Sequence, residues 1–223
     1  MQQHQPCHDS SRCHRRRVAG LSVLLFFSCL LLSFHAFAAQ SADSTDENNA
    51  ENKNAYVFRE HLVSYPVTGD SIEALRRSID SYRIVDASGK RHDADTRSNI
   101  HWTYTTASDA SGCSLVSFHT TLDVQITLPQ WQASAYASDE LRQHWADYMS
   151  ALRVHEDGHV QNGRMEAAAI DHLLESVGPH ADCGLLDRDV EELTTQIHQQ
   201  FEMNDIEYDR RTEHGRTQGA IFP

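Results

Sequence analysis

Apolar and polar residues alternate most regularly between residues 116 and 128. The positions on one face of this segment are Val116, Phe118, Thr120, Leu122, Val124, Ile126 and Leu128. A period of two residues indicates a β-strand with one buried face. A shorter alternation over 100–104 predicts a partner strand, and the sequence SDASG at 108–112 predicts the hairpin turn that joins the two. Residues 56–67 are also rich in apolar side chains and predict a third strand.

Apolar residues spaced three and four apart replace this alternation after residue 137. Ser138 is a candidate N-cap, because two acidic residues follow it in the first turn, where they complement the helix dipole. The apolar stripe of this helix is Leu141, Trp145, Tyr148, Leu152, Ile170, Leu173, Leu174 and Val177. The Gly-Pro pair at 178–179 ends it. A second helix is predicted from about 185 to 208, and a short one over 70–79 opens with Asp70 as its N-cap.

These elements predict an α+β fold for residues 55–223, in which a small antiparallel sheet packs on long helices. The chain ends in the apolar segment Ala220-Ile221-Phe222, so we expect the tail to pack back onto this domain.

The N-terminal region has the pattern of a targeting segment. Four arginines precede an apolar run over 21–34, and Ala36-Phe37-Ala38 fits the small-residue rule for cleavage. Residues 1–38 are therefore predicted to be a secretory signal peptide, cleaved near Ala38, and residues 39–54 an acidic, disordered linker. The apolar run is short for a membrane span, so no stable membrane anchor is expected after cleavage. The protein is predicted to be periplasmic or secreted.

Composition narrows the function further. The formal net charge of −13 argues against nucleic acid as a partner, because nucleic-acid-binding domains carry a basic surface. Export would leave only Cys113 and Cys183 in the mature chain, and in an oxidising compartment two cysteines most simply form one disulfide. Two free, buried thiols are the alternative. The 15 histidines raise the chance of metal chemistry and also of accidental motifs.

The segment His155-Glu156-Asp157-Gly158-His159 matches the pattern H-E-x-x-H. On a helix, residues four apart lie on one face, so both imidazoles can reach one zinc ion. Glu156 would then lie beside a zinc-activated water, whose pKa falls to about 7, and act as general base. The apolar stripe continues onto His155 and His159, where aliphatic residues would be expected. The alternative is a pair of hydrogen-bonded core histidines with Glu156 on a solvated flank.

A catalytic zinc site needs a third protein ligand. We expect His214, because Gly215 beside it permits a turn toward the helix. Glu191 or Glu192 could supply the third ligand instead, but a solvent-exposed helix face is the simpler interpretation of these two residues. Tyr208 is a candidate catalytic residue that donates to the developing oxyanion, although packing is as plausible a role for it. Asp209 is a candidate for orienting a ligand, with a plain surface role as the alternative.

The chain resembles the bacterial family called domain of unknown function 922, whose members are described as predicted secreted zinc-dependent proteases. The likeness covers most of residues 56–223. It rests on the Trp102-x-Tyr104 region, the H-E-x-x-H segment and the tail Tyr208-Asp209-x-x-Thr212-x-His214-Gly215-x-x-Gln218-Gly219-Ala220-x-Phe222-Pro223. The resemblance implies a zincin-like metallopeptidase, with the H-E-x-x-H motif on a central helix, the helix histidines as zinc ligands and the glutamate as base.

We therefore expect an exported zinc metallopeptidase that acts on a peptide or protein substrate, bound as an extended chain along strand 116–128 or its neighbour. A different amide, such as a peptidoglycan cross-link, is the nearest enzymatic alternative. The alternative from another class is a periplasmic module that binds zinc or a partner without catalysis.

Overall fold

The computed structural model describes residues 56–85 and 89–223. The predicted signal peptide and acidic linker lie outside these residues. The elements follow one another as β1 (Tyr56–Val67), α1 (Ile72–Tyr82), β2 (Ile84–Val85), β3 (Arg91–His92), β4 (Asp95–Asp109), β5 (Gly112–Trp131), α2 (Asp139–Ser176), α3 (Cys183–Thr212) and the 3₁₀ turn η1 (Arg216–Gln218). The domain is thus a mixture of helices and a small sheet, which confirms the predicted fold class at that level.

The main sheet has the order β1-β5-β4, and the predicted hairpin of β4 and β5 is present. The expectation of a purely antiparallel sheet was wrong, because β1 pairs with β5 in parallel, from Tyr56 opposite Thr120 to Val67 opposite Trp131. The chain leaves β1 through α1 and the β2–β3 ladder before it enters β4. Strand β4 therefore runs antiparallel to β1, and the tight turn between β4 and β5 makes β5 parallel to β1 again.

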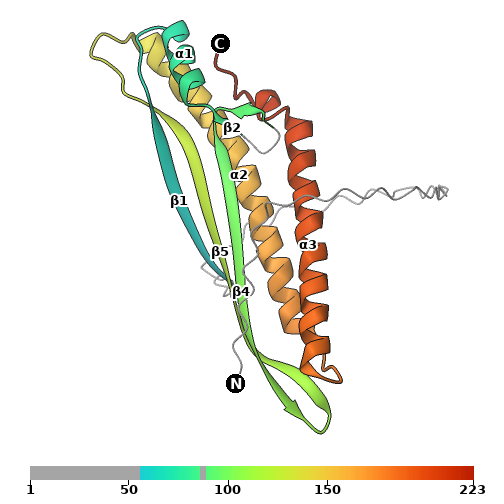
Figure 1. The fold of residues 1–223 in the computed structure, drawn as a ribbon. Helices are drawn as coiled ribbons and strands as arrows, with labels where there is room; N and C mark the ends of the chain where they lie inside the picture. Colours follow the sequence, from blue (N-terminus) through green and yellow to red (C-terminus); the bar gives the residue numbers. More distant parts are fainter. Residues whose placement is uncertain (1–55, 86–88) are drawn as a thin grey trace, which may run out of the picture. The chain divides into compact units, whose positions relative to one another are not determined.

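Helix α2 lies between this sheet and α3, with which it forms a long antiparallel pair (Figure 1). The Ser138 side chain accepts a hydrogen bond from the Leu141 backbone N–H, and the helix ends at Ser176, so both predicted ends are confirmed. Helix α1 begins at Ile72 with Ser71 as its N-cap, one residue after the predicted cap. None of the helices in the described part of the chain is long and apolar enough to cross a membrane.

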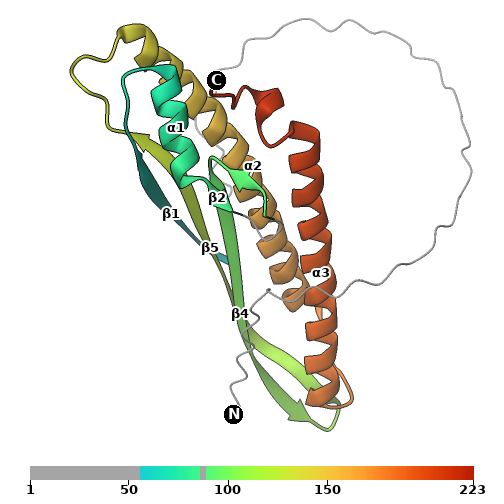
Figure 2. The ribbon, with the colours of Figure 1, turned by 45° about the horizontal axis from the view of Figure 1, so that its top comes forward.

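Apolar packing holds the sheet and helices together at three levels. In the middle, Leu122, Val124 and Ile126 of β5 are fully buried among Val160 and Ala167 of α2. Toward the start of α2, Phe222 is buried against Tyr148 and Leu152, which confirms that the tail packs down. Figure 2 shows the chain end returning toward α2.

The third level lies at the opposite end, where α2 meets α3 and the β4–β5 hairpin. Its buried members are Cys113, Ile170, Leu174, Leu186 and Val190. The structure joins Cys113 to Cys183 in a disulfide across a sequence separation of 70, as expected for the two cysteines outside the predicted signal.

Candidate metal centre

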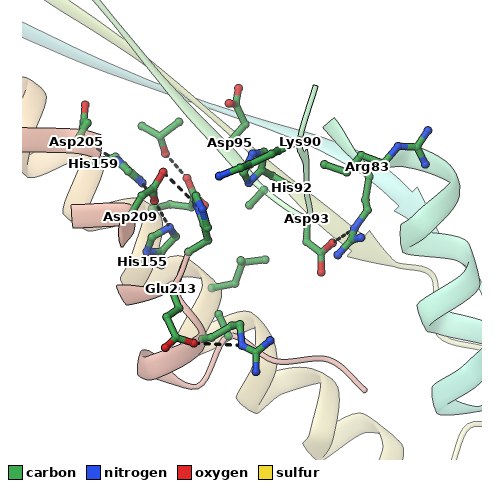
Figure 3. A pocket seen from close by; sticks show the side chains of 18 residues that line it. Arg83, Lys90, His92, Asp93, Asp95, His155, His159, Asp205, Asp209 and Glu213 are labelled. Carbon is green, nitrogen blue, oxygen red and sulfur yellow. Dashed lines mark hydrogen bonds and ion pairs between the residues drawn. The ribbon is translucent and has the colours of Figure 1, made fainter. Parts of the chain in front are cut away.

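His155 and His159 of α2 point to one carboxylate of α3 (Figure 3). The Nε2 atom of His155 and the Nε2 atom of His159 each lie 3.2 Å from Oδ1 of Asp209. Ligand atoms of these three residues all lie within 4.8 Å of one another. The antiparallel register of α2 and α3 brings the three groups together, because it sets Asp209 beside the H-E-x-x-H turn.

The oxygen at the centre of this group is unsatisfied. Asp209 Oδ1 is buried, and neither imidazole reaches it with the geometry of a hydrogen bond. An unpaired buried acceptor is costly and requires an explanation. A cation held between Oδ1 and the two Nε2 atoms would satisfy all three, and two imidazoles with one carboxylate are a donor set that zinc takes. The residues therefore fit a zinc ion.

The far nitrogen of each imidazole is anchored. Nδ1 of His159 lies 2.8 Å from Oδ1 of Asp205, and Nδ1 of His155 lies 3.1 Å from Oε1 of Gln218. Both partners are acceptors, so with Nδ1 as the donor a neutral ring would direct the Nε2 lone pair toward Asp209, where a metal could take it. Metal-binding histidines are oriented in this way by carboxylates and carbonyls around the ligands.

The close packing of imidazoles and carboxylates shifts the pKa values of Asp209 and His159. Burial on its own raises the pKa of Asp209, but the imidazoles of His155, His159 and His214 outweigh it, so this pKa lies well below its usual range. Burial on its own lowers the pKa of His159. The Asp205 and Asp209 carboxylates outweigh that effect and raise the pKa to about 10. Without a metal, the raised pKa favours the protonated form of His159, which lies 2.8 Å from Asp205 and 3.2 Å from Asp209.

Glu156 is 3% exposed. Its Oε2 accepts a hydrogen bond of 2.7 Å from the Thr96 hydroxyl at the start of β4. Burial raises the pKa of Glu156, although the Thr96 hydrogen bond and the two imidazoles oppose the shift. A buried carboxyl with a raised pKa and a single orienting donor is suited to hold and release a proton.

Tyr208 lies behind the histidines. Its ring stacks on His155 at 5.2 Å between centroids, its hydroxyl donates to the His155 carbonyl, and Gln218 Nε2 donates to that hydroxyl. It is not among the residues that line the cavity described below. The placement supports packing rather than the expected oxyanion donor. The contact also explains Gly158, since a Cβ there would lie 2.1 Å from the Tyr208 hydroxyl oxygen.

His214 does not join the three-residue group. Helix α3 continues to Thr212 instead of ending near 208, so Asp209 faces α2 from a helix and takes the place expected for His214. The Nδ1 atom of His214 lies 3.2 Å from the other oxygen of Asp209, Oδ2. The alternative ligands Glu191 and Glu192 are exposed and lie near the start of α3, far from Asp209 at its end.

Sequence reasoning missed Asp205 and Thr96. Asp205 and Asp209 are four residues apart on α3, as the two histidines are on α2. This matched spacing is the signal that would have pointed to Asp205 as well as Asp209. Thr96 has no comparable signal, because its role depends on where β4 begins next to α2.

A cavity of about 590 Å³ opens in front of the centre. Helices α2 and α3 contribute the metal-binding candidates and Glu156, and the opposite wall comes from the chain at 90–96 and from the tail. A metal held at Asp209 would therefore face a space large enough for part of a ligand.

Residues 62–215 match the sequence model of a family described as bacterial proteins of unknown function, DUF922. The chain belongs to this family. The DUF922 match includes His155, Glu156, His159 and Asp209, and it ends before Gln218. No curated protein and no solved structure matches the chain. The fit of these residues to zinc therefore rests on their geometry.

Proposed function

We propose that this DUF922 protein is an exported zinc-dependent metallopeptidase whose zinc ligands are His155, His159 and Asp209. The observation that carries the proposal is the convergence of two Nε2 atoms on one unsatisfied carboxylate oxygen, with Glu156 beside them at a cavity. A site that only stabilised the fold would be closed by four protein ligands. Here the three-residue group faces open space instead.

Zinc, when bound, supplies Lewis acidity that polarises a carbonyl and makes a coordinated water acidic enough to react near neutral pH. The protein residues have separate tasks. Asp205 and Gln218 hold the two imidazole rings in the orientation that directs Nε2 to the centre. The Asp209 carboxylate balances part of the ion's charge.

Glu156 acts as general base and then as general acid. Its buried carboxylate takes a proton from the attacking water and returns it to the nitrogen of the leaving amine. The Thr96 hydroxyl holds Oε2, so the carboxylate stays directed along one side of the cavity. The raised pKa of Glu156 favours uptake of that proton.

Strand β4 supports a peptide substrate. It is an edge strand, because the main sheet has the order β1-β5-β4, and its first residues Asp95 and Thr96 line the cavity. An extended peptide that adds to this edge would pass in front of the zinc ligands. This is the neighbour of strand 116–128, one of the two platforms expected from the sequence.

Two measurements on the purified protein test the proposal. Elemental analysis after metal-replete preparation should find zinc, and a mixture of quenched fluorescent peptides should be cleaved. The Glu156→Gln variant should keep the zinc and lose at least about 100-fold in cleavage rate, as expected for removal of a general base. Glu175→Gln is the matched control, because Glu175 is an exposed glutamate of the same helix.

The other outcomes decide between the alternatives. A protein without zinc would return the histidines to the role of hydrogen-bonded core residues. A protein that binds zinc but cleaves neither peptides nor peptidoglycan fragments would be a non-catalytic zinc-binding or partner-binding module.

A further inference from the structure

The cavity in front of the candidate metal centre has basic side chains on the side away from α2 and α3. We call this side the basic wall; its residues are Arg83, Lys90, Arg91 and His92. Such a wall is unexpected in a chain with a net charge of −13. The part of the chain that the structure describes contains no lysine besides Lys90. The chemistry proposed for zinc and Glu156 gives these basic residues no task.

Lys90 is the member of the basic wall that lies opposite the candidate zinc ligands. It immediately precedes β3, two positions before His92. Figure 3 shows Lys90 and His92 across the cavity from His155 and His159. The ring of His92 lies 5.1 Å from that of His214, between centroids, and Nδ1 of His214 lies 3.2 Å from Asp209 Oδ2. These contacts place the 90–92 segment on the Asp209 side of the cavity. The guanidinium of Arg83, by contrast, is directed to Asp93 at 2.6 Å.

The acidic side chains of the cavity do not exclude an entering anion, because each has a partner within the protein. Glu156 accepts from the Thr96 hydroxyl, and Asp205 and Asp209 lie against imidazoles. The carboxylates that pair with arginines are Asp93, Asp95 and Glu213. With zinc bound at Asp209, an anion in the cavity would have positive charge on two sides.

A peptide that follows β4 would bring its carboxylate to this place. The 90–92 segment precedes β4, so an extended chain that adds to the β4 edge and runs toward Asp95 continues along the basic wall. The cavity volume of about 590 Å³ is that of a pocket for a small ligand, which suits the end of a chain or one side chain.

We propose that Lys90 binds a carboxylate of the peptide substrate, so that the enzyme selects peptides that place a negative charge next to the scissile bond. This proposal rests on the proposed function and adds the substrate class to it. The lysine ammonium acts as a point charge on a flexible stem and does not require a bidentate geometry. The carboxylate is supplied either by the C-terminus of the peptide or by an aspartate or glutamate side chain.

Two pairs of peptides distinguish these sources. The first pair has one sequence with either a free C-terminus or a C-terminal amide. The second pair is amidated and differs by glutamate or glutamine at one position. In at least one pair, the wild-type protein should cleave the charged member with a kcat/KM at least about 10-fold higher, as expected for a hydrogen bond between charged groups. The difference should lie mainly in KM, because Lys90 binds substrate and transition state alike.

The Lys90→Gln variant should keep its zinc and lose this preference, whereas Lys90→Arg should retain it. Arg77→Gln is the matched control for the loss of one positive charge, because Arg77 is exposed on α1 and does not line the cavity. Calorimetry with the same peptide pairs on the zinc-loaded Glu156→Gln protein measures the preference as binding, independently of cleavage.

The possible results separate this proposal from the proposed function. Equal cleavage of both members of both pairs contradicts carboxylate recognition and leaves the peptidase intact. A preference that survives in Lys90→Gln contradicts the role of Lys90. A protein that binds zinc and prefers charged peptides in a Lys90-dependent way, but cleaves none, supports the carboxylate site and contradicts the peptidase. A protein that binds no zinc contradicts the proposed function and this extension with it.

Discussion

The two ends of the α2–α3 pair are built in opposite ways. At one end the facing side chains are titratable, with His155 and His159 on α2 against Asp205 and Asp209 on α3. At the other end they are aliphatic: Ile170 and Leu174 pack against Leu186 and Val190. A salt bridge of 2.8 Å between His198 and Glu166 lies between the two ends. The same helices thus carry a polar centre and an apolar clamp.

We infer from this difference that the apolar end stabilises the helix pair, whereas the polar end carries the candidate site. Leu174 and Leu186 are essentially fully buried, and the Cys113–Cys183 disulfide fastens the start of α3 to the start of β5. A well-packed end fixes the register of α2 against α3, so the polar end does not have to hold the helices together. The polar end can therefore tolerate an unsatisfied carboxylate oxygen, as the proposed zinc site requires.

The sharpest way to break the polar end is His159→Ala. This change removes one of the three proposed zinc ligands and also the partner of Asp205 and Asp209. We expect zinc binding to be lost altogether, because catalytic zinc sites need three protein ligands. Elemental analysis measures the zinc content. Zinc retained at the wild-type level would show that His159 is not a ligand.

The apolar end is broken most directly by Leu174→Ala. Leu174 is 1% exposed, and truncation of a buried leucine to alanine costs about 2–5 kcal/mol of unfolding free energy. Chemical denaturation followed by circular dichroism gives the value, and the zinc affinity of the folded fraction should stay the same. Met165→Ala is the control, because Met165 is 51% exposed and its truncation should change stability by less than about 0.5 kcal/mol. A loss of zinc affinity in Leu174→Ala without loss of stability would contradict the division between the two ends.

A smaller effect is expected from Asp205→Asn. The substitution keeps the size of the side chain but removes the carboxylate that orients Nδ1 of His159 at 2.8 Å. Loss of such a partner lowers metal affinity by about 10- to 100-fold. Competition with a zinc indicator measures the change. Glu202→Gln, one turn earlier and exposed, controls for the loss of one negative charge on α3; equal effects of both substitutions would reduce Asp205 to a long-range charge.

The elements themselves were largely predictable from the sequence, because their signals are local. The Ser138 cap and the Gly-Pro pair at 178–179 gave both ends of α2, and strict alternation gave β5. The direction of β1 was not predictable in this way. The 27 residues between β1 and β4 allow either direction relative to β5, and only the packing of the sheet decides it.

The site was predictable only as far as one helix carries it. Spacing along α2 brought His155, Glu156 and His159 together, since residues one turn apart share a face. Asp209 was recognised as a candidate near the site but not as part of the three-residue group, because its place depends on the register between two helices. His214 was expected there because Gly215 permits a turn toward α2, but α3 continues past the predicted end near 208 to Thr212 and so presents Asp209 instead.

The smallest effect concerns protons. Without metal, the pKa of His159 is raised to about 10, so the ring is protonated at pH 7.5, whereas a zinc ligand must be neutral. Zinc binding at pH 7.5 should therefore release about one proton from His159, and calorimetry in buffers of different ionisation enthalpy counts it. Since the folded pKa lies above the unfolded one, the same group stabilises the metal-free fold below pH 6.5 and loses that contribution as the pH rises through about 10. Asp205→Asn removes a main cause of the raised pKa and should reduce the number of protons released. A binding enthalpy independent of the buffer would mean that His159 is already neutral, and that Asp205 and Asp209 do not hold a proton between them.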